Sequence, residues 1–166
     1  MTERKLKRGL LCGEEEAIRQ VIEENYEAIY RYCYYHLGER MAAQDAAQDV
    51  FLKFLSSLGQ YREWGKIKNY LYVIARNTVK DKRKKKQEIV LEHLPETGME
   101  REEPMEEQVL IRLALRELSR EEQELIILRY YQDLRLKDIA KVMGMPISNV
   151  RYHLKKAEQR LKEVLL

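Results

Sequence analysis

The sequence has 166 residues, of which 36% are charged and 45% apolar, and its formal net charge at pH 7 is +3. This apolar fraction excludes wholesale disorder, and glycine (7) and proline (3) are scarce, so we expect an all-α protein. No segment approaches the roughly 20 apolar residues of a membrane helix, so we expect no membrane insertion. Cys12 and Cys33 lack metal-ligand spacing. We therefore expect no metal and no cofactor, and two isolated thiols fit the reducing cytoplasm.

The first half of the chain predicts a three-helix bundle that follows an N-terminal tail at residues 1–13. From Glu14 onward, apolar residues recur every three or four positions in three successive stretches, which is the period of an amphipathic helix. Three helices of this length can pack around one small core, so we expect residues 14–86 to form one domain. The expected helices span about 14–37, 42–58 and 66–86.

The charge of the chain changes sharply near residue 87. Between Arg76 and Lys86 there are seven basic residues and one acid, whereas residues 87–107 hold eight glutamates and one arginine. The basic segment favours a polyanionic partner. Like charges, together with Pro95 and Gly98, keep a chain extended, so we expect residues 87–105 to form a flexible acidic linker.

Residues 106–166 predict a second small helical domain. Ser119 and Glu122 have the spacing of a capping box, in which the serine caps a new helix and the glutamate reaches back. That helix is expected to end near residue 132. The expected fold is therefore two small helical domains joined by the linker.

The end of this domain predicts a helix-turn-helix. A short helix over 136–143 is followed by Gly144, which tolerates the positive φ of a tight turn, and by a longer helix over 149–165 that Ser148 can cap. Such a helix fits the major groove of DNA, where Asn and Arg read bases and Lys holds phosphate. The alternative is an ordinary helical hairpin with a basic solvated face. The outer face and N-terminal end of the last helix carry Ser148, Asn149, Arg151, Tyr152, Lys155 and Lys156.

The third helix of the first domain, with the loop before it, combines aromatic and basic side chains. Rings can stack on bases while cations follow the backbone, which suits single-stranded DNA. The alternative is that Trp64 is a core aromatic and the lysines form a solvated face. The loop supplies Tyr61 and Trp64, and the outer side of the helix is expected to carry Lys68, Asn69, Tyr72, Arg76, Asn77, Lys80, Arg83 and Lys84.

The second helix has a polar, partly acidic edge formed by Gln44, Asp45, Gln48 and Asp49. Such an edge on an otherwise apolar helix usually faces solvent. It can also serve as a docking surface for a basic partner.

These motifs resemble those of the extracytoplasmic-function sigma factors, the compact branch of the bacterial sigma-70 family of RNA polymerase sigma factors. The segments that resemble region two of this family are 45–51, 69–77 and 81–85. The segments that resemble region four are 118–123, 128–131, 138–140 and 149–157. Two motif sets in this order are more specific than a lone helix-turn-helix.

The resemblance implies that the chain binds core RNA polymerase and promoter DNA. It implies that Asp45, Gln48 and Asp49 dock on the clamp helices of the largest polymerase subunit. It also implies that the last helix reads the minus-thirty-five element as duplex, and that family members are often held by a cognate anti-sigma factor. Reading and melting of the minus-ten element, with one base flipped out, is implied for Tyr61, Trp64, Asn69, Tyr72, Arg76, Asn77, Lys80, Arg83 and Lys84.

The recognition helix departs from the family pattern. The family commonly has Thr-Val-Lys-Ser-Arg where this chain has Asn149-Val150-Arg151-Tyr152-His153, which predicts an unusual promoter motif. Two alternatives stay open: a free-standing helix-turn-helix regulator, and a degenerate sigma-like protein that binds polymerase without initiating. The sequence has no nucleophile–base pair, metal-binding carboxylate cluster or phosphate loop, so we expect no catalytic residues and no enzyme.

Overall fold

The computed structural model describes residues 2–60, 65–92 and 113–165. The chain divides into two compact units, whose described parts are residues 2–92 and 113–165. Within these ranges every regular element is helical and no strand occurs. The prediction of an all-α protein with two small helical domains is confirmed.

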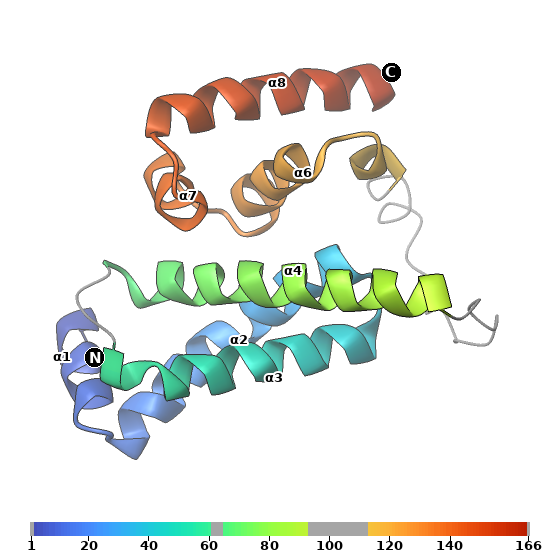
Figure 1. The fold of residues 1–166 in the computed structure, drawn as a ribbon. Coiled ribbons are helices and arrows are strands. Elements are labelled where there is room, and N and C mark those ends of the chain that lie inside the picture. Colours follow the sequence, from blue (N-terminus) through green and yellow to red (C-terminus); the bar gives the residue numbers. More distant parts are fainter. Residues whose placement is uncertain (1, 61–64, 93–112, 166) are drawn as a thin grey trace. The chain divides into compact units, whose positions relative to one another are not determined.

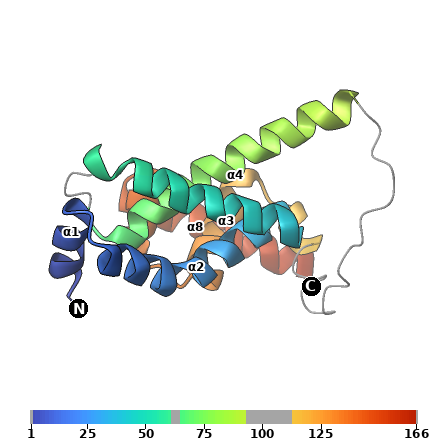
Figure 2. The same cartoon turned by 90° about the horizontal axis from the view of Figure 1, so that it is seen from below.

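Three long helices form the predicted bundle of the first unit, namely α2 (Glu15–Leu37), α3 (Arg40–Ser56) and α4 (Ile67–Glu92). Figures 1 and 2 show α4 lying along both α2 and α3. Gly38 ends α2 with φ of 77°, which only glycine adopts readily. A short 3-10 helix, η1 (Leu58–Gln60), follows α3. The core between the helices includes Val21, Ile29, Tyr32, Cys33, Ala43, Ala46, Ala47, Val50, Phe54, Leu71 and Ala75.

The N-terminal segment forms a helix, although residues 1–13 were expected to be a tail. Helix α1 (Glu3–Leu11) begins after Thr2, whose hydroxyl accepts a hydrogen bond from the backbone of Lys5. It packs on α2 and buries Leu6 and Leu10. The spacing of these two leucines, one helical turn apart behind a threonine cap, is the signal that could have predicted it.

Helix α4 also extends beyond the predicted domain. It continues to Glu92, whereas the acidic linker was expected to begin at residue 87. Glutamate, glutamine and leucine are good helix formers, so the helix continues across the change of charge. The remainder of the expected linker, residues 93–105, lies outside the described residues.

The second unit contains α6 (Arg120–Ile126), a π-helix (Ile127–Tyr131), α7 (Leu136–Met143) and α8 (Ile147–Leu165). Residues 113–116 form a further helical turn. The expected bounds of α7 agree with the structure. None of the helices described for the two units is long and apolar enough to cross a membrane.

The capping box before α6 differs in detail from the prediction. The Ser119 hydroxyl accepts a hydrogen bond from the backbone N–H of Glu122 at 3.2 Å, as expected for a cap. The same hydroxyl donates to the Glu122 carboxylate at 3.0 Å. That carboxylate also accepts a 2.8 Å hydrogen bond from Arg160 on α8, so the cap links α6 to the last helix.

Candidate nucleic-acid interface

The turn between α7 and α8 has the geometry that the sequence predicted. Gly144 adopts φ of 64° and ψ of 39°, and the backbone N–H of Met145 donates to the carbonyl of Ala140 at 3.1 Å. Helix α8 begins at Ile147, two residues earlier than expected, so Ser148 lies inside its first turn and does not cap it. The carbonyl of Pro146 accepts the backbone N–H groups of Asn149 and Val150.

Helix α8 presents a polar and basic face to solvent. Val150, Leu154 and Ala157 are buried against the rest of the second unit, which fixes the rotation of the helix about its axis. Tyr152 is the largest side chain on the opposite face and is 65% exposed. All six residues predicted to contact duplex DNA are exposed, namely Ser148, Asn149, Arg151, Tyr152, Lys155 and Lys156.

The basic segment of α4 divides into two groups with different surroundings. Lys82, Arg83 and Lys86 make ion pairs or hydrogen bonds within the bundle. Lys80 and Lys84 are exposed. Residues four apart on a helix lie on neighbouring turns. Lys80 and Lys84 therefore form a row along α4 with the half-buried Arg76, and the exposed Asn77 lies beside it. We call Arg76, Asn77, Lys80 and Lys84 the α4 stripe.

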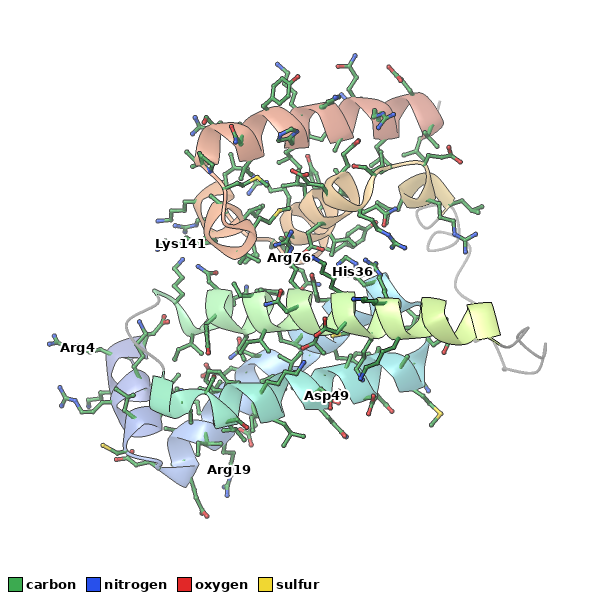
Figure 3. The ribbon with its side chains drawn as sticks, in the orientation of Figure 1. Arg4, Arg19, His36, Asp49, Arg76 and Lys141 are labelled. Atoms are coloured by element: carbon green, nitrogen blue, oxygen red, sulfur yellow. The ribbon has the colours of Figure 1, made fainter. Side chains whose placement is uncertain are left out.

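Arg83 lies inward, although it was predicted to lie on the outer side of the helix. Its guanidinium donates to Nδ1 of His36 at 2.6 Å and to the carbonyl oxygen of His36 at 3.1 Å. Arginine has no acceptor, so Nδ1 of His36 accepts in this contact. The last carbonyls of a helix have no intrahelical partner, and Arg83 satisfies one at the end of α2, where Figure 3 labels His36.

Two other residues predicted on the outer side are buried. Asn69 and Tyr72 are each 1% exposed. The ring of Tyr72 packs edge-on against Tyr32 of α2, with centroids 5.7 Å apart. The Lys68 ammonium lies 5.9 Å from the centroid of the Tyr72 ring, within the range of a cation–π contact. Tyr61 and Trp64 lie outside the described residues.

The polar edge of α3 carries the three residues predicted to bind polymerase. Gln48 is exposed, and Asp45 and Asp49 both pair with Lys82 of α4 at 2.6 and 2.9 Å. The hydrogen bond to Asp45 is the largest cause of a raised pKa of Lys82, with Asp49 contributing in the same direction. Sequence reasoning missed Lys82 as a partner of this edge, because it lies among other lysines on another helix.

Comparisons with known proteins match both units. The Sigma-70 region 2 model matches residues 21–89, and the Sigma-70 region 4 model matches residues 108–161. The extracytoplasmic-function (ECF) sigma factor BldN of Streptomyces coelicolor is 31% identical over 144 residues, covering 80% of this chain and 54% of BldN. The sigma factor YlaC of Bacillus subtilis is 28% identical over 158 residues, covering 89% and 91% of the two chains.

Two solved structures share the fold. CnrH in complex with the cytosolic domain of CnrY superposes with a TM-score of 0.80 at 18% identity, over 98% of this chain and 96% of that chain. RpoE in complex with the anti-sigma factor NepR from Bartonella quintana superposes with a TM-score of 0.71 at 21% identity, over 89% of this chain and 95% of that chain.

The two matched regions, in this order along one helical chain, define a bacterial transcription initiation factor. The chain belongs to the sigma-70 family of RNA polymerase sigma factors, in its extracytoplasmic-function branch. It binds core RNA polymerase and directs promoter-specific initiation. A free-standing helix-turn-helix regulator has no region 2, so that alternative is set aside.

Proposed function

We propose that three helices divide the work of initiation, with the α3 edge docking on polymerase, the α4 stripe engaging the minus-ten element, and α8 reading the minus-thirty-five element. The observation that carries this proposal is the exposure of Lys80 and Lys84 on α4 and of a polar and basic face on α8. RNA synthesis itself belongs to the polymerase, so the proposal assigns this chain no catalytic residue. Such a factor works in the cytoplasm, where bacterial promoters lie.

Polymerase docking is assigned to Asp45, Gln48 and Asp49. Gln48 is exposed, and the Asp45 side chain remains 65% exposed although it pairs with Lys82. An acidic edge that is partly neutralised can still attract a basic partner.

Promoter opening is assigned to the α4 stripe, together with Tyr61 and Trp64 of the preceding segment. Cations in a row suit the phosphates of a separated strand, and aromatic rings suit its unstacked bases. Asn69, Tyr72 and Arg83 enter this proposal as residues that shape the helix from its inner side, because they are buried or half-buried.

Duplex recognition is assigned to Ser148, Asn149, Arg151, Tyr152, Lys155 and Lys156 on α8. Each good base contact contributes about 1–3 kcal/mol, and phosphate contacts weaken as salt rises. One short helix therefore binds weakly alone. Polymerase would hold the two units at the promoter spacing and so raise their effective concentration on DNA.

An anti-sigma factor is a further proposed partner. Both solved structures with this fold are complexes: CnrH is bound to the cytosolic domain of CnrY, and the sigma factor RpoE is bound to the anti-sigma factor NepR. We propose that this chain is also held by such a protein, which would cover at least one of its two interaction surfaces.

The test is transcription in vitro with purified chain, bacterial core polymerase and fragmented DNA from the host genome, followed by mapping of RNA 5′ ends. New starts that share two upstream motifs are the expected result. Polymerase binding without new starts would indicate the degenerate sigma-like alternative. Absence of polymerase binding would contradict the proposal as a whole.

A further inference from the structure

We propose that α1 is a working part of region 2 and that Glu3 on it is a positioning residue, which caps the start of α4 and supports promoter opening. The proposal rests on the function proposed above for the α4 stripe. It gives a role to an N-terminal helix that lies before the part of the chain matched by the region 2 model.

The contact that carries the proposal joins two segments far apart in the sequence. A carboxylate oxygen of Glu3 accepts a 2.8 Å hydrogen bond from the backbone N–H of Ile67, the first residue of α4. In Figures 1 and 2, α1 lies at the end of the bundle where α4 begins. The first N–H groups of a helix lack intrahelical partners, and a carboxylate there also meets the positive end of the helix dipole.

Helix α4 does not supply this carboxylate itself. Its first turn contains no acidic residue, and the residues directly before it are Gly65 and Lys66, neither of which has a side-chain oxygen. Lysine is unfavourable at this end of a helix dipole. Glu3 therefore provides a negative charge that neither the first turn of α4 nor the two residues directly before it supply.

Helix α1, which carries Glu3, packs closely on α2. Leu10 is 1% exposed, and a β-carbon built on Gly9 would lie 2.7 Å from the β-carbon of Ala17. The carbonyl of Gly9 also accepts the backbone N–H of Glu14 at 2.9 Å. Arg4, the neighbour of Glu3, points away from the bundle in Figure 3. The helix is thus held closely enough to present Glu3 to α4.

The consequence for function follows from the continuity of α4. Lys68 lies in its first turn and contacts the Tyr72 ring, and the α4 stripe begins at Arg76, about two turns further along. Loss of the cap would allow the first turn to fray. DNA contacts that depend on the start of α4 would weaken, whereas the α3 edge would be unaffected.

The experiment compares Glu3→Ala and Glu3→Gln with Glu23→Gln, which removes the same charge from an exposed position on α2. Hydrogen exchange measures the first-turn amides of α4, and permanganate footprinting by holoenzyme measures strand opening at a duplex promoter. For Glu3→Ala we expect about fivefold faster exchange at Ile67 and about fivefold less opening, the typical effect of losing a helix cap. Glu3→Gln should be intermediate, since it keeps an acceptor oxygen and loses the charge.

Two readouts separate positioning from general destabilisation. Polymerase affinity should equal that of the unmodified chain, and a promoter with a pre-melted minus-ten region should restore transcription. The inference would be overturned if Glu3→Ala lost transcription equally on duplex and pre-melted promoters. It would also be overturned if Glu3→Ala and Glu23→Gln gave the same hydrogen exchange and the same strand opening. Failure of the unmodified chain to initiate would instead contradict the proposed function, so the two failures are distinguishable.

Discussion

Lys82 on α4 donates a 2.6 Å hydrogen bond to Asp45 on α3, and its ammonium also lies 2.9 Å from Asp49. The edge proposed to dock on polymerase is therefore tied to the helix proposed to open the promoter. The Lys82 side chain is 25% exposed, so solvent screens the pair only in part. One cation thus joins the edge proposed to dock on polymerase to the helix that carries the α4 stripe.

Replacement of Lys82 by methionine should lower the free energy of unfolding by about 0.5–1 kcal/mol at neutral pH, the usual size for a partly exposed ion pair. The pKa of Lys82 is raised above 10.5 in the folded chain. The stabilisation is therefore fully present at neutral pH and is lost as pH rises through the folded pKa. Urea unfolding from pH 7 to alkaline pH measures this difference, which should shrink at the alkaline end.

The same substitution should raise affinity for core polymerase at low salt, because Asp45 and Asp49 become available to a basic partner. Lys85→Met is the control, since Lys85 is exposed and no ion pair is recorded for it among the described residues. Reduced polymerase binding by Lys82→Met alone would show that the lysine itself contributes to docking.

Substitution of Lys80 or Lys84 by alanine should weaken promoter binding by holoenzyme and make it less dependent on salt. Each exposed cation that neutralises a phosphate contributes about one unit to the slope of log affinity against log salt. A salt titration of holoenzyme on one promoter measures the slope. An unchanged slope in the Lys80→Ala, Lys84→Ala double variant would contradict the assignment of the α4 stripe.

Arg83→Ala, unlike the Lys80 and Lys84 variants, should change the stability of the fold and leave DNA binding unaffected. Its guanidinium hydrogen-bonds to His36 within the bundle, and hydrogen bonds from charged groups contribute about 1.5–3 kcal/mol. We expect a loss of stability in that range in chemical denaturation, with the salt slope of promoter binding unchanged. A lower slope with full stability would place Arg83 on DNA instead.

Arg151→Ala should cost about 1–3 kcal/mol in binding to the minus-thirty-five element and relax the preference at one base pair. Binding of holoenzyme to a panel of single-base promoter variants measures both effects. Lys162→Ala, an exposed cation in the last turn of α8, is the control and should leave the preference intact. The same loss against every promoter variant would reassign Arg151 to a phosphate.

The two thiols should differ in reactivity. Burial raises the pKa of Cys33 to about 12, although the nearby charge of Lys82 acts in the opposite direction. Cys12 is exposed. Since the thiolate is the reactive form, an alkylating reagent at pH 8 should modify Cys12 quickly and Cys33 only after denaturation. Rapid modification of both in the folded chain would contradict this burial.

Local signals predicted the second unit well. Gly144 and the capping serine Ser119 act on their immediate neighbours, and their effects on the backbone can be read directly from the sequence. Helix periodicity likewise predicted the buried face of α3 and of the first part of α8, as Val50 and Leu154 show.

The predictions that were wrong concern residues whose surroundings are formed by a segment far away in the sequence. Arg83 was expected to face outward because it is charged, and only the end of α2 opposite it explains its inward position. Tyr72 was placed with the DNA-facing residues because it lies next to cations, yet Tyr32 packs against it. The contact of Glu3 with Ile67 joins two helices that are far apart in the sequence, so no local sequence pattern predicts it.

Gly9→Ala should destabilise the chain by about 1–3 kcal/mol, because the added β-carbon would meet Ala17 at 2.7 Å and push α1 away from α2. Thermal or chemical denaturation measures the loss. Gly59→Ala is the matched control, since a β-carbon there meets nothing within 4 Å. Equal stability of the two variants would show that α1 adapts to the extra methyl group.

The close contact between Gly9 and Ala17 also has a genetic consequence. A strain that carries Gly9→Ala should show weak expression of the genes that depend on this factor, although residue 9 lies on neither of the helices proposed to contact DNA. Selection for restored expression should recover Ala17→Gly, which removes the opposing methyl group. Each substitution would then suppress the defect of the other. Recovery of the two substitutions together would show that the packing of α1 on α2 is needed for the activity of the factor.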